Sequence, residues 1–183
     1  MTQGIALLRG INVGRAKRIL MAELRTLIEG LGFSEVRTLL NSGNVVFQTA
    51  RPRVGKVAAS IAAAIEKEFG FTVPVVVLTA RELNTIVAEN ALHQGTADPS
   101  KLLVAFVASR STLARAEPLL AESWAPDAIS IGSKAAYLWC ANGVIRSELA
   151  QAFSRATGEG ATMRNWATVL KLQAAATTGR DSD

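Results

Sequence analysis

The segment Val36-Arg-Thr-Leu-Leu-Asn-Ser-Gly-Asn-Val-Val-Phe-Gln48 contains two apolar runs on either side of four turn-forming residues. Val36–Leu40 and Val45–Gln48 are short runs typical of β-strands. Asn41-Ser-Gly-Asn44 between them has the residue types of a tight turn. We therefore predict a β-hairpin over residues 36–48.

Two segments with helical spacing flank the hairpin. Apolar residues recur at intervals of three and four over Met21–Leu31 and over Val54–Phe69, and a glycine closes each segment. Beyond them, Ile5–Leu8 and Val73–Leu78 are apolar runs of strand length. The resulting order, β-α-β-β-α-β, is that of a ferredoxin-like module.

A similar order restarts in the second half. A connecting helix over Ala80–Asn90 and a join over residues 91–100 precede it. The predicted elements are a strand at Leu102–Ala108, a helix at Thr112–Glu122 that Pro118 can interrupt, strands at Ala128–Ile131 and Ala135–Trp139, and helices at Arg146–Ala156 and Thr162–Ala175.

The predicted fold class is α+β, with two consecutive ferredoxin-like βαββα(β) subdomains packed into one compact unit. Residues 1–90 form the first subdomain with its connecting helix, residues 101–176 form the second with a closing helix, and residues 177–183 form a mobile tail. Val73–Leu78 and Leu102–Val107 are apolar at nearly every position, which predicts strands that are covered on both faces.

The composition is that of a folded domain with a reduced thiol. Apolar residues make up 49% of the 183 residues and charged residues 19%, which is typical of globular proteins. Cys140 is the single cysteine, so no internal disulfide can form, and a reducing compartment is favoured. No apolar run approaches the roughly 20 residues of a membrane helix. We expect a cytoplasmic protein with no membrane partner.

Positive charge is concentrated in the first third of the sequence. Residues 1–60 contain nine Lys or Arg and three Glu, a net charge of +6, whereas the whole chain carries +5. A basic surface attracts anions over about a Debye length. The same bias also fits a solvated surface without a partner, and both interpretations stay open.

Four of these cations lie in one glycine-containing segment, Leu8-Arg-Gly-Ile-Asn-Val-Gly-Arg-Ala-Lys-Arg18. Gly10 and Gly14 allow backbone N–H groups to turn toward a ligand. Guanidinium and ammonium groups suit phosphate or carboxylate. The glycine spacing is not that of a Walker A loop, so the segment is either an anion-binding loop or a turn that merely needs glycine.

Topology predicts that this segment and the hairpin turn are neighbours. The first two strands of a βαββαβ module are parallel, because a right-handed crossover joins them. Their ends therefore lie at the same edge of the sheet. The two segments together predict an anion-binding pocket, formed by Arg9, Asn12, Arg15, Lys17, Arg18, Ser42 and Asn44.

A further cation stands at the predicted start of the last helix. Thr162 can cap a helix there, yet the first turn would carry Arg164, and a cation is unfavourable at the positive end of a helix dipole. A ligand anion would compensate, and so would an ordinary ion pair with a carboxylate of the fold. Arg164 and Asn165 therefore join the candidate anion-binding residues.

The sequence shows no recognisable catalytic or metal-binding pattern. His93 is the single histidine, which excludes metal sites with two or more histidines. Cys140 has no evident partner base. We expect no metal and no cofactor, and we assign no catalytic residue.

Five sets of motifs occur over residues 4–175: Leu7-Leu-Arg-Gly-Ile-Asn-Val-Gly14, Met21-Ala-Glu-Leu24, Leu31-Gly-Phe33, Val36-Arg-Thr38 with Ser42-Gly-Asn-Val45, and Arg164-Asn-Trp166 with Thr168-Val-Leu-Lys-Leu172. Together they resemble the bacterial domain-of-unknown-function 1697 family. The resemblance implies an α+β fold of two ferredoxin-like subdomains and no accepted activity. Arg15 departs from a glycine usual in that family, which makes the loop stiffer and more basic, and Met163 departs from the usual threonine or valine.

Three classes of function remain open at this point. The first is an anion binder for a nucleotide, a phosphorylated metabolite or a nucleic-acid backbone. The second is an enzyme for an acidic or phosphorylated small molecule, in which guanidinium groups stabilise developing charge. The third is an interaction module that assembles through sheet edges or an apolar face, for example as a homodimer, and fold analogy supports it only weakly.

Overall fold

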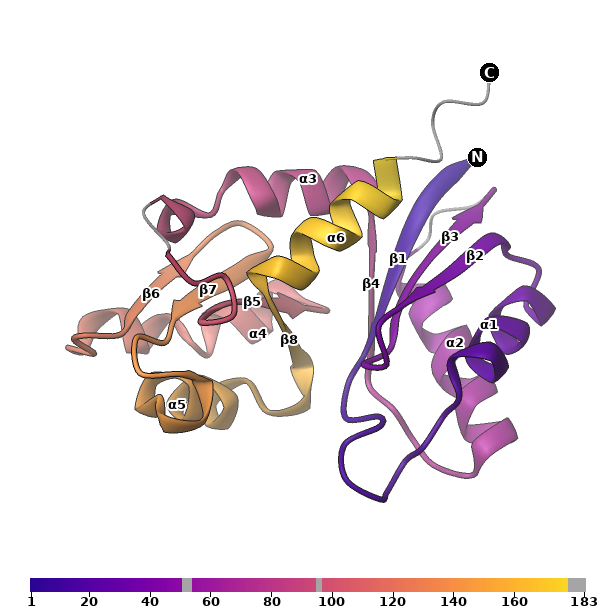
Figure 1. Cartoon of the computed structure of the whole chain (residues 1–183), viewed down its shortest axis with the longest axis horizontal. Coiled ribbons are helices and arrows are strands. Elements are labelled where there is room, and N and C mark those ends of the chain that lie inside the picture. Colours follow the sequence, from indigo (N-terminus) through magenta and orange to yellow (C-terminus); the bar gives the residue numbers. More distant parts are fainter. Residues whose placement is uncertain (51–53, 95–96, 178–183) are drawn as a thin grey trace. The chain divides into compact units, whose positions relative to one another are not determined.

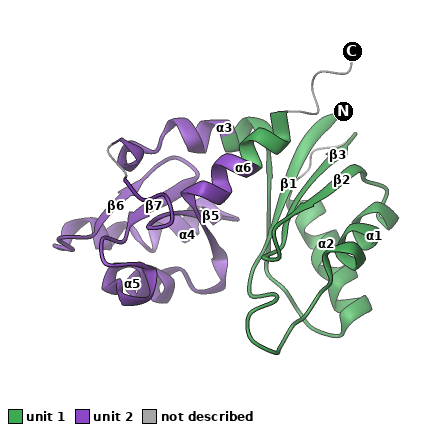
Figure 2. Ribbon diagram, viewed as in Figure 1, with its two compact units in different colours: residues 1–83, 172–183 green, residues 84–171 purple. Residues whose placement is uncertain are grey.

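The structure is a computed structural model and describes residues 1–50, 54–94 and 97–177. Its contacts divide the chain into two compact units, residues 1–83 with 172–183 and residues 84–171 (Figure 2). The divisions fall inside helices α3 (Ala80–Ala88) and α6 (Trp166–Thr177). Of the predicted tail, Thr177 ends α6, and residues 178–183 lie outside the described residues.

The first unit contains a four-stranded antiparallel sheet in the order β2-β3-β1-β4. Two helices connect its strands, and Figure 1 shows both on one face of the sheet. The elements are β1 (Thr2–Leu8), α1 (Met21–Gly30), β2 (Ser34–Leu39), β3 (Asn44–Thr49), α2 (Val54–Phe69) and β4 (Val75–Thr79). The predicted strands and helices of this half are confirmed, with small shifts at their ends.

The core of the first unit lies between the sheet and these two helices. On α2, Val57, Ile61 and Ile65 recur every four residues and are buried, so they form one apolar stripe. They pack with Leu24 and Ile28 of α1 and with alternate residues of the strands. Burial of such a stripe, more than intrinsic helix propensity, holds helices of this length in place.

The second unit contains another four-stranded antiparallel sheet, in the order β6-β7-β5-β8. Its elements are the 3₁₀ helix η1 (Ala91–His93), β5 (Leu102–Val107), α4 (Arg110–Ala114), η2 (Glu117–Ala121), β6 (Ala128–Ile131), β7 (Ala135–Trp139), η3 (Val144–Arg146), α5 (Glu148–Thr157), η4 (Gly158–Gly160) and β8 (Ala161–Asn165). Leu113 of α4, with Leu149 and Phe153 of α5, packs in the core against alternate residues of this sheet.

The prediction of strands covered on both faces is confirmed for β5. Five consecutive residues, Leu102–Phe106, are buried, so neither face of that strand meets solvent. The same holds for Ile5–Leu8 in β1. The result for β4 is different, because buried Val76 and Leu78 alternate with half-buried residues.

The end of the second half differs from the prediction. Residues 161–165 form strand β8, which pairs with β5, and α6 begins only at Trp166. The predicted helix over Thr162–Ala175 was therefore wrong in its first turn. β8 gives the second sheet its fourth strand.

Pro118 divides the predicted helix over Thr112–Glu122. The structure has the short helix α4 followed by the 3₁₀ segment η2, in which Pro118 stands in the first turn. A proline there needs no N–H partner, whereas inside a helix it would remove one hydrogen bond.

Among the described residues, no helix is both long enough and apolar enough to cross a membrane.

Candidate functional site

The basic segment after β1 and the turn between β2 and β3 are in direct contact, as the topology predicts. The N–H of Leu8 donates to the carbonyl of Gly43 at 2.8 Å, and Nδ2 of Asn12 donates to the carbonyl of Asn41 at 2.8 Å. Gly43 has φ 76°, and a Cβ there would lie 2.7 Å from Cβ of Leu8. A glycine is therefore required at this point of the turn, both by its backbone conformation and by the close approach.

Asn12 holds the basic segment in its conformation. Its Nδ2 also donates to the carbonyl of Ile19 at 2.9 Å, and its Oδ1 accepts from the N–H of Ile19 at 3.0 Å. Its backbone N–H donates to the carbonyl of Lys17 at 3.1 Å, which closes the loop across its base. The left-handed φ of 56° is one that asparagine tolerates better than most residues. The amide of Asn12 is thus a structural group rather than a ligand-binding one.

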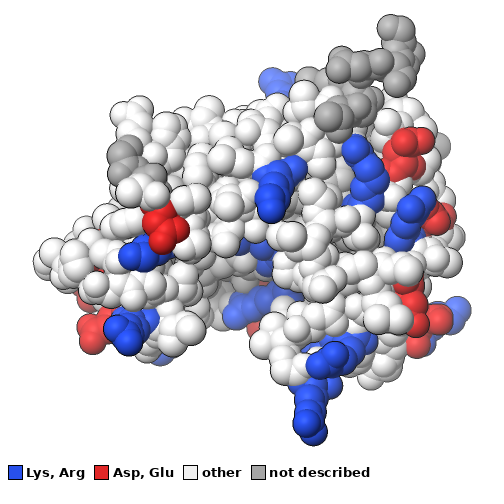
Figure 3. All heavy atoms as spheres, viewed as in Figure 1, with Lys and Arg blue, Asp and Glu red and all other residues white. Residues whose placement is uncertain are grey.

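Arg15, Lys17 and Arg18 are the exposed cations of this loop. Arg18 donates from Nη2 to the carbonyl of Gly14 at 3.0 Å, and Lys17 donates from Nζ to the carbonyl of Thr72 at 2.9 Å. None of the three contacts a carboxylate of the described residues. Figure 3 shows blue atoms gathered at the tip of the segment between β1 and α1. Three positive charges therefore face solvent from one closed loop.

The remaining predicted residues of this unit are Arg9, Ser42 and Asn44, and Asn44 is the one with a clear structural role. Asn44 is 0% exposed, and its Nδ2 donates to the carbonyl of Leu39 and to Oγ of Ser42, both at 2.9 Å. Ser42 itself is exposed. Arg9 is half-buried, and its backbone N–H donates to the carbonyl of Pro74 at 3.0 Å. The side chain of Asn44 therefore stabilises the hairpin.

Arg164 and Asn165 belong to the second unit and lie at the end of β8, not in a helix. Arg164 is 9% exposed and donates from Nη1 to Oγ1 of Thr162 at 2.9 Å and to the carbonyl of Met163 at 2.8 Å. Burial lowers the pKa of Arg164 to about 10. Oδ1 of Asn165 accepts from the N–H of Thr168 at 2.9 Å and so caps α6. The proposed cation at a helix N-terminus is therefore corrected to a cation in a strand.

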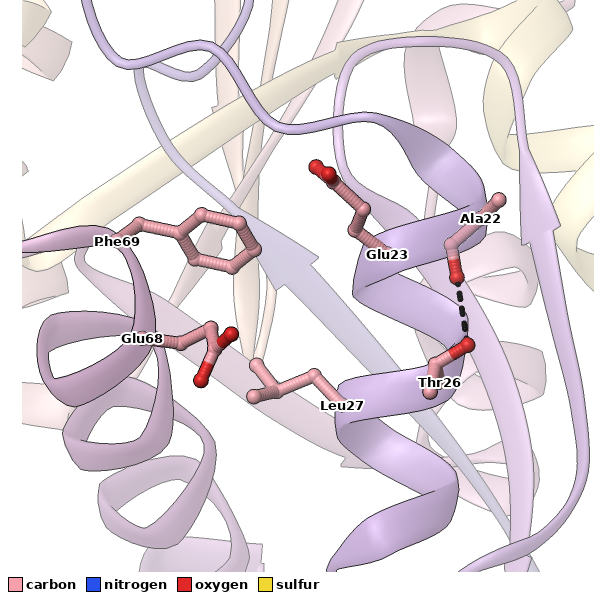
Figure 4. A pocket seen from close by; sticks show the side chains of 6 residues that line it. All are labelled: Ala22, Glu23, Thr26, Leu27, Glu68 and Phe69. Atoms are coloured by element: carbon pink, nitrogen blue, oxygen red, sulfur yellow. Dashed lines mark hydrogen bonds between the residues drawn. The ribbon is translucent and has the colours of Figure 1, made fainter.

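One hollow adjoins the basic loop, a second lies between α1 and α2, and Glu23 lines both. The first, of about 350 Å³, is lined by Asn12, Arg18, Ile19, Leu20, Met21, Glu23 and Asn41. The second, of about 420 Å³, lies between α1 and α2 and is lined by Ala22, Glu23, Thr26, Leu27, Glu68 and Phe69 (Figure 4). Sequence reasoning missed Glu68 and Phe69, because it had no signal for the end of α2 packing beside the start of α1.

Metal-binding and nucleophilic groups are sparse among residues 1–50, 54–94 and 97–177. This part of the chain has no group of three His, Cys, Asp or Glu residues that could hold a metal ion. Cys140 is buried, and burial raises the pKa of its thiol. His93 is exposed, with its ring 5.8 Å from that of Trp166. Neither residue forms a recognisable catalytic arrangement.

Comparison with known proteins gives a family and a fold. The model of a family described as "Protein of unknown function (DUF1697)" matches residues 1–137, which confirms the resemblance drawn from the motifs of that range; Arg164-Asn-Trp166 lies beyond it. The solved structure of the conserved bacterial protein SP0830 from Streptococcus pneumoniae is similar, with a TM-score of 0.76 at 18% identity over 96% of this chain and 99% of that one. At this identity the similarity shows the fold alone. No curated protein matches the sequence.

Proposed function

The chain belongs to the DUF1697 family, whose description names no activity, and from the geometry of its basic loop we propose that it binds a phosphate-bearing ligand. The single observation that carries this proposal is the loop itself. Its backbone is closed by the hydrogen bonds of Asn12, and it presents Arg15, Lys17 and Arg18 to solvent without a carboxylate contact. A loop whose backbone is already ordered loses less entropy when an anion binds than a flexible one does.

Alternatives to phosphate binding are less well supported. Glu23 is the carboxylate that lines the hollow beside Arg18, and its Oε2 accepts from the N–H of Leu20 at 3.3 Å at the start of α1. A helix-capping role accounts for this position without general-base chemistry. The geometry therefore favours binding over catalysis, and we assign no reaction.

We also propose that each unit is a ferredoxin-like subdomain and that the chain arose by duplication. In each sheet the four strands are antiparallel, and the third strand along the chain pairs with both the first and the second. With a helix after the first strand and another after the third, this is the β-α-β-β-α-β order of that fold. We further propose a cytoplasmic location, because Cys140 is the single cysteine and a reducing compartment is favoured.

The proposal is tested by binding measurements at two salt concentrations. Inorganic phosphate, nucleoside monophosphates and short single-stranded RNA and DNA are titrated into the full chain. We expect binding that weakens as salt rises, and for a nucleic acid each contacting cation adds about one to the slope of log K against log salt. Replacing Arg15, Lys17 or Arg18 by Ala should reduce the affinity and this slope.

Lys56→Ala is the matched control, because Lys56 is an exposed cation at the start of α2. Lys17 contacts Thr72, beyond the opposite end of that 16-residue helix. The control should leave affinity almost unchanged. Absence of binding to every ligand at low salt, or equal losses in Lys56→Ala and in the loop variants, would contradict the proposal.

A further inference from the structure

The two hollows share Glu23 in their linings and otherwise present different chemical groups. Arg18 lines the first hollow, Glu23 lines both, and Glu68 and Phe69 line the second. The loop is tied to this region, since Nζ of Lys17 donates to the carbonyl of Thr72, close in sequence to Phe69. A cation lines the first hollow, an aromatic ring lines the second, and the carboxylate of Glu23 lines both.

The second hollow has an apolar wall and free carboxylate oxygens. Phe69 and Leu27 are half-buried, and the ring of Phe69 stacks on that of Phe71 with centroids 6.1 Å apart. Figure 4 shows Phe69, Leu27 and both glutamates around the same space. Glu68 has no hydrogen-bond or ion-pair partner among the described residues, and Glu23 uses one oxygen to accept from Leu20. A planar group with N–H donors would complement this lining.

We propose that the two hollows act as one groove that binds a guanine nucleotide, with its phosphate on Arg18 and the neighbouring loop cations and its base between α1 and α2. The inference rests on the proposed phosphate-binding function and names the ligand class for the same surface. In this arrangement Glu23, at the junction of the hollows, accepts a ribose hydroxyl, a role that acidic residues have in other nucleotide sites. The base packs on Phe69, since every base has a face that stacks on an aromatic ring.

Glu68 selects the base. Guanine carries two adjacent donors, N1–H and the N2 amino group, which one carboxylate can accept together in a bidentate pair. Adenine and cytosine place a ring acceptor beside their amino group, and uracil has one N–H between two carbonyls. A carboxylate at the base edge therefore favours guanine, because each of the other bases would turn a lone pair of a ring nitrogen or carbonyl toward it.

The test titrates the full chain with GMP, IMP, AMP, guanosine and inorganic phosphate by calorimetry. IMP lacks the N2 amino group and guanosine lacks the phosphate. We expect GMP to bind roughly tenfold more tightly than IMP or AMP, the discrimination typical of one bidentate base contact. Glu68→Gln should remove most of that preference and leave the affinity for inorganic phosphate unchanged. Glu66→Gln, an exposed glutamate of α2 outside the groove, should change neither value.

The outcomes separate this inference from the function on which it rests. Equal affinities for GMP, IMP and AMP, or a GMP preference that survives Glu68→Gln, would overturn the guanine site while phosphate binding stands. If Arg18→Ala leaves phosphate affinity unchanged but guanosine binding still requires Glu68, the loop proposal fails and the base site is retained. No binding of guanosine or GMP at millimolar concentration overturns the site whatever phosphate does.

Discussion

Nδ2 of Asn12 donates a 2.8 Å hydrogen bond to the carbonyl of Asn41, across 29 positions of sequence. The same nitrogen donates to Ile19 within the loop. One side chain therefore fixes the conformation of the basic loop and also its place beside the hairpin. The arrangement of the cations depends on this residue, although the residue itself has no hydrogen-bond donor left for an anion.

Asn12→Ala is expected to destabilise the protein by about 2–4 kcal/mol. The substitution removes three side-chain hydrogen bonds, each worth ~1 kcal/mol net, and places alanine at a φ of 56°. Urea denaturation measures the free energy of unfolding. Asn12→Gly separates the two causes, because glycine accepts this φ but makes no side-chain bond. If both variants unfold at the wild-type midpoint, the hydrogen bonds do not hold the loop.

Gly43→Ala is expected to be strongly destabilising, by about 2 kcal/mol or more. Its Cβ would lie 2.7 Å from Cβ of Leu8 and 2.9 Å from Cδ1 of Ile11, in a left-handed backbone conformation. The matched control is Gly55→Ala in α2, where nothing lies within 4 Å of the added methyl. This control should stabilise by about 0.5–1 kcal/mol. Similar melting temperatures for the two variants would refute the close packing of loop and turn.

The sequence predicted the regular elements where apolar periodicity and turn residues agree. The hairpin, α1 and α2 each combine a clear apolar pattern with a glycine-containing end. β8 was missed because Ala161–Asn165 contains Met, Arg and Asn and continues into α6 without an intervening turn. Its pairing with β5 comes from tertiary structure, which local propensity does not record.

The candidate site could be predicted in its location but not in the roles of its residues. Right-handed crossover topology was enough to bring the basic loop to the hairpin turn. The structural roles of Asn12 and Asn44 depend on backbone angles and on carbonyls up to 29 residues away, and residue type alone does not indicate these. Phe69 and Glu68 entered the site only through helix packing.

Ser147→Ala is expected to destabilise the second unit by about 1–3 kcal/mol. Oγ of Ser147 accepts from the N–H of Ala150 at 3.0 Å at the start of α5 and donates to Oδ2 of Asp127 at 2.7 Å. The variant loses the helix cap and one hydrogen bond to a carboxylate. Ser154→Ala, within the same helix and without a side-chain hydrogen bond among the described residues, should change stability little. Equal effects of the two substitutions in thermal denaturation would argue against the cap.

Stability is expected to fall between pH 8 and pH 10 because of Cys140. Burial raises the pKa of this thiol in the folded state, with the charge of Asp127 acting in the same direction, although a hydrogen bond with Ser147 opposes the shift. In the unfolded chain the thiol ionises near pH 8.5. Above that pH the unfolded state releases a proton that the folded state retains, so the free energy of unfolding decreases. Below pH 8 the thiol is protonated in both states, so its ionisation does not reduce the free energy of unfolding.

The measurement is urea denaturation of the reduced protein at pH 7, 8, 9 and 10, with Cys140→Ala as the comparison. The variant should start from a lower stability, because it leaves a small cavity in the core. Above the unfolded pKa, the free energy of unfolding of the variant should decline less steeply than that of the wild type. The difference is up to about 1.4 kcal/mol per pH unit. Other groups that titrate in this range are common to both proteins and cancel in the difference. Parallel pH profiles would mean that the folded protein accommodates the Cys140 thiolate as readily as the unfolded chain does.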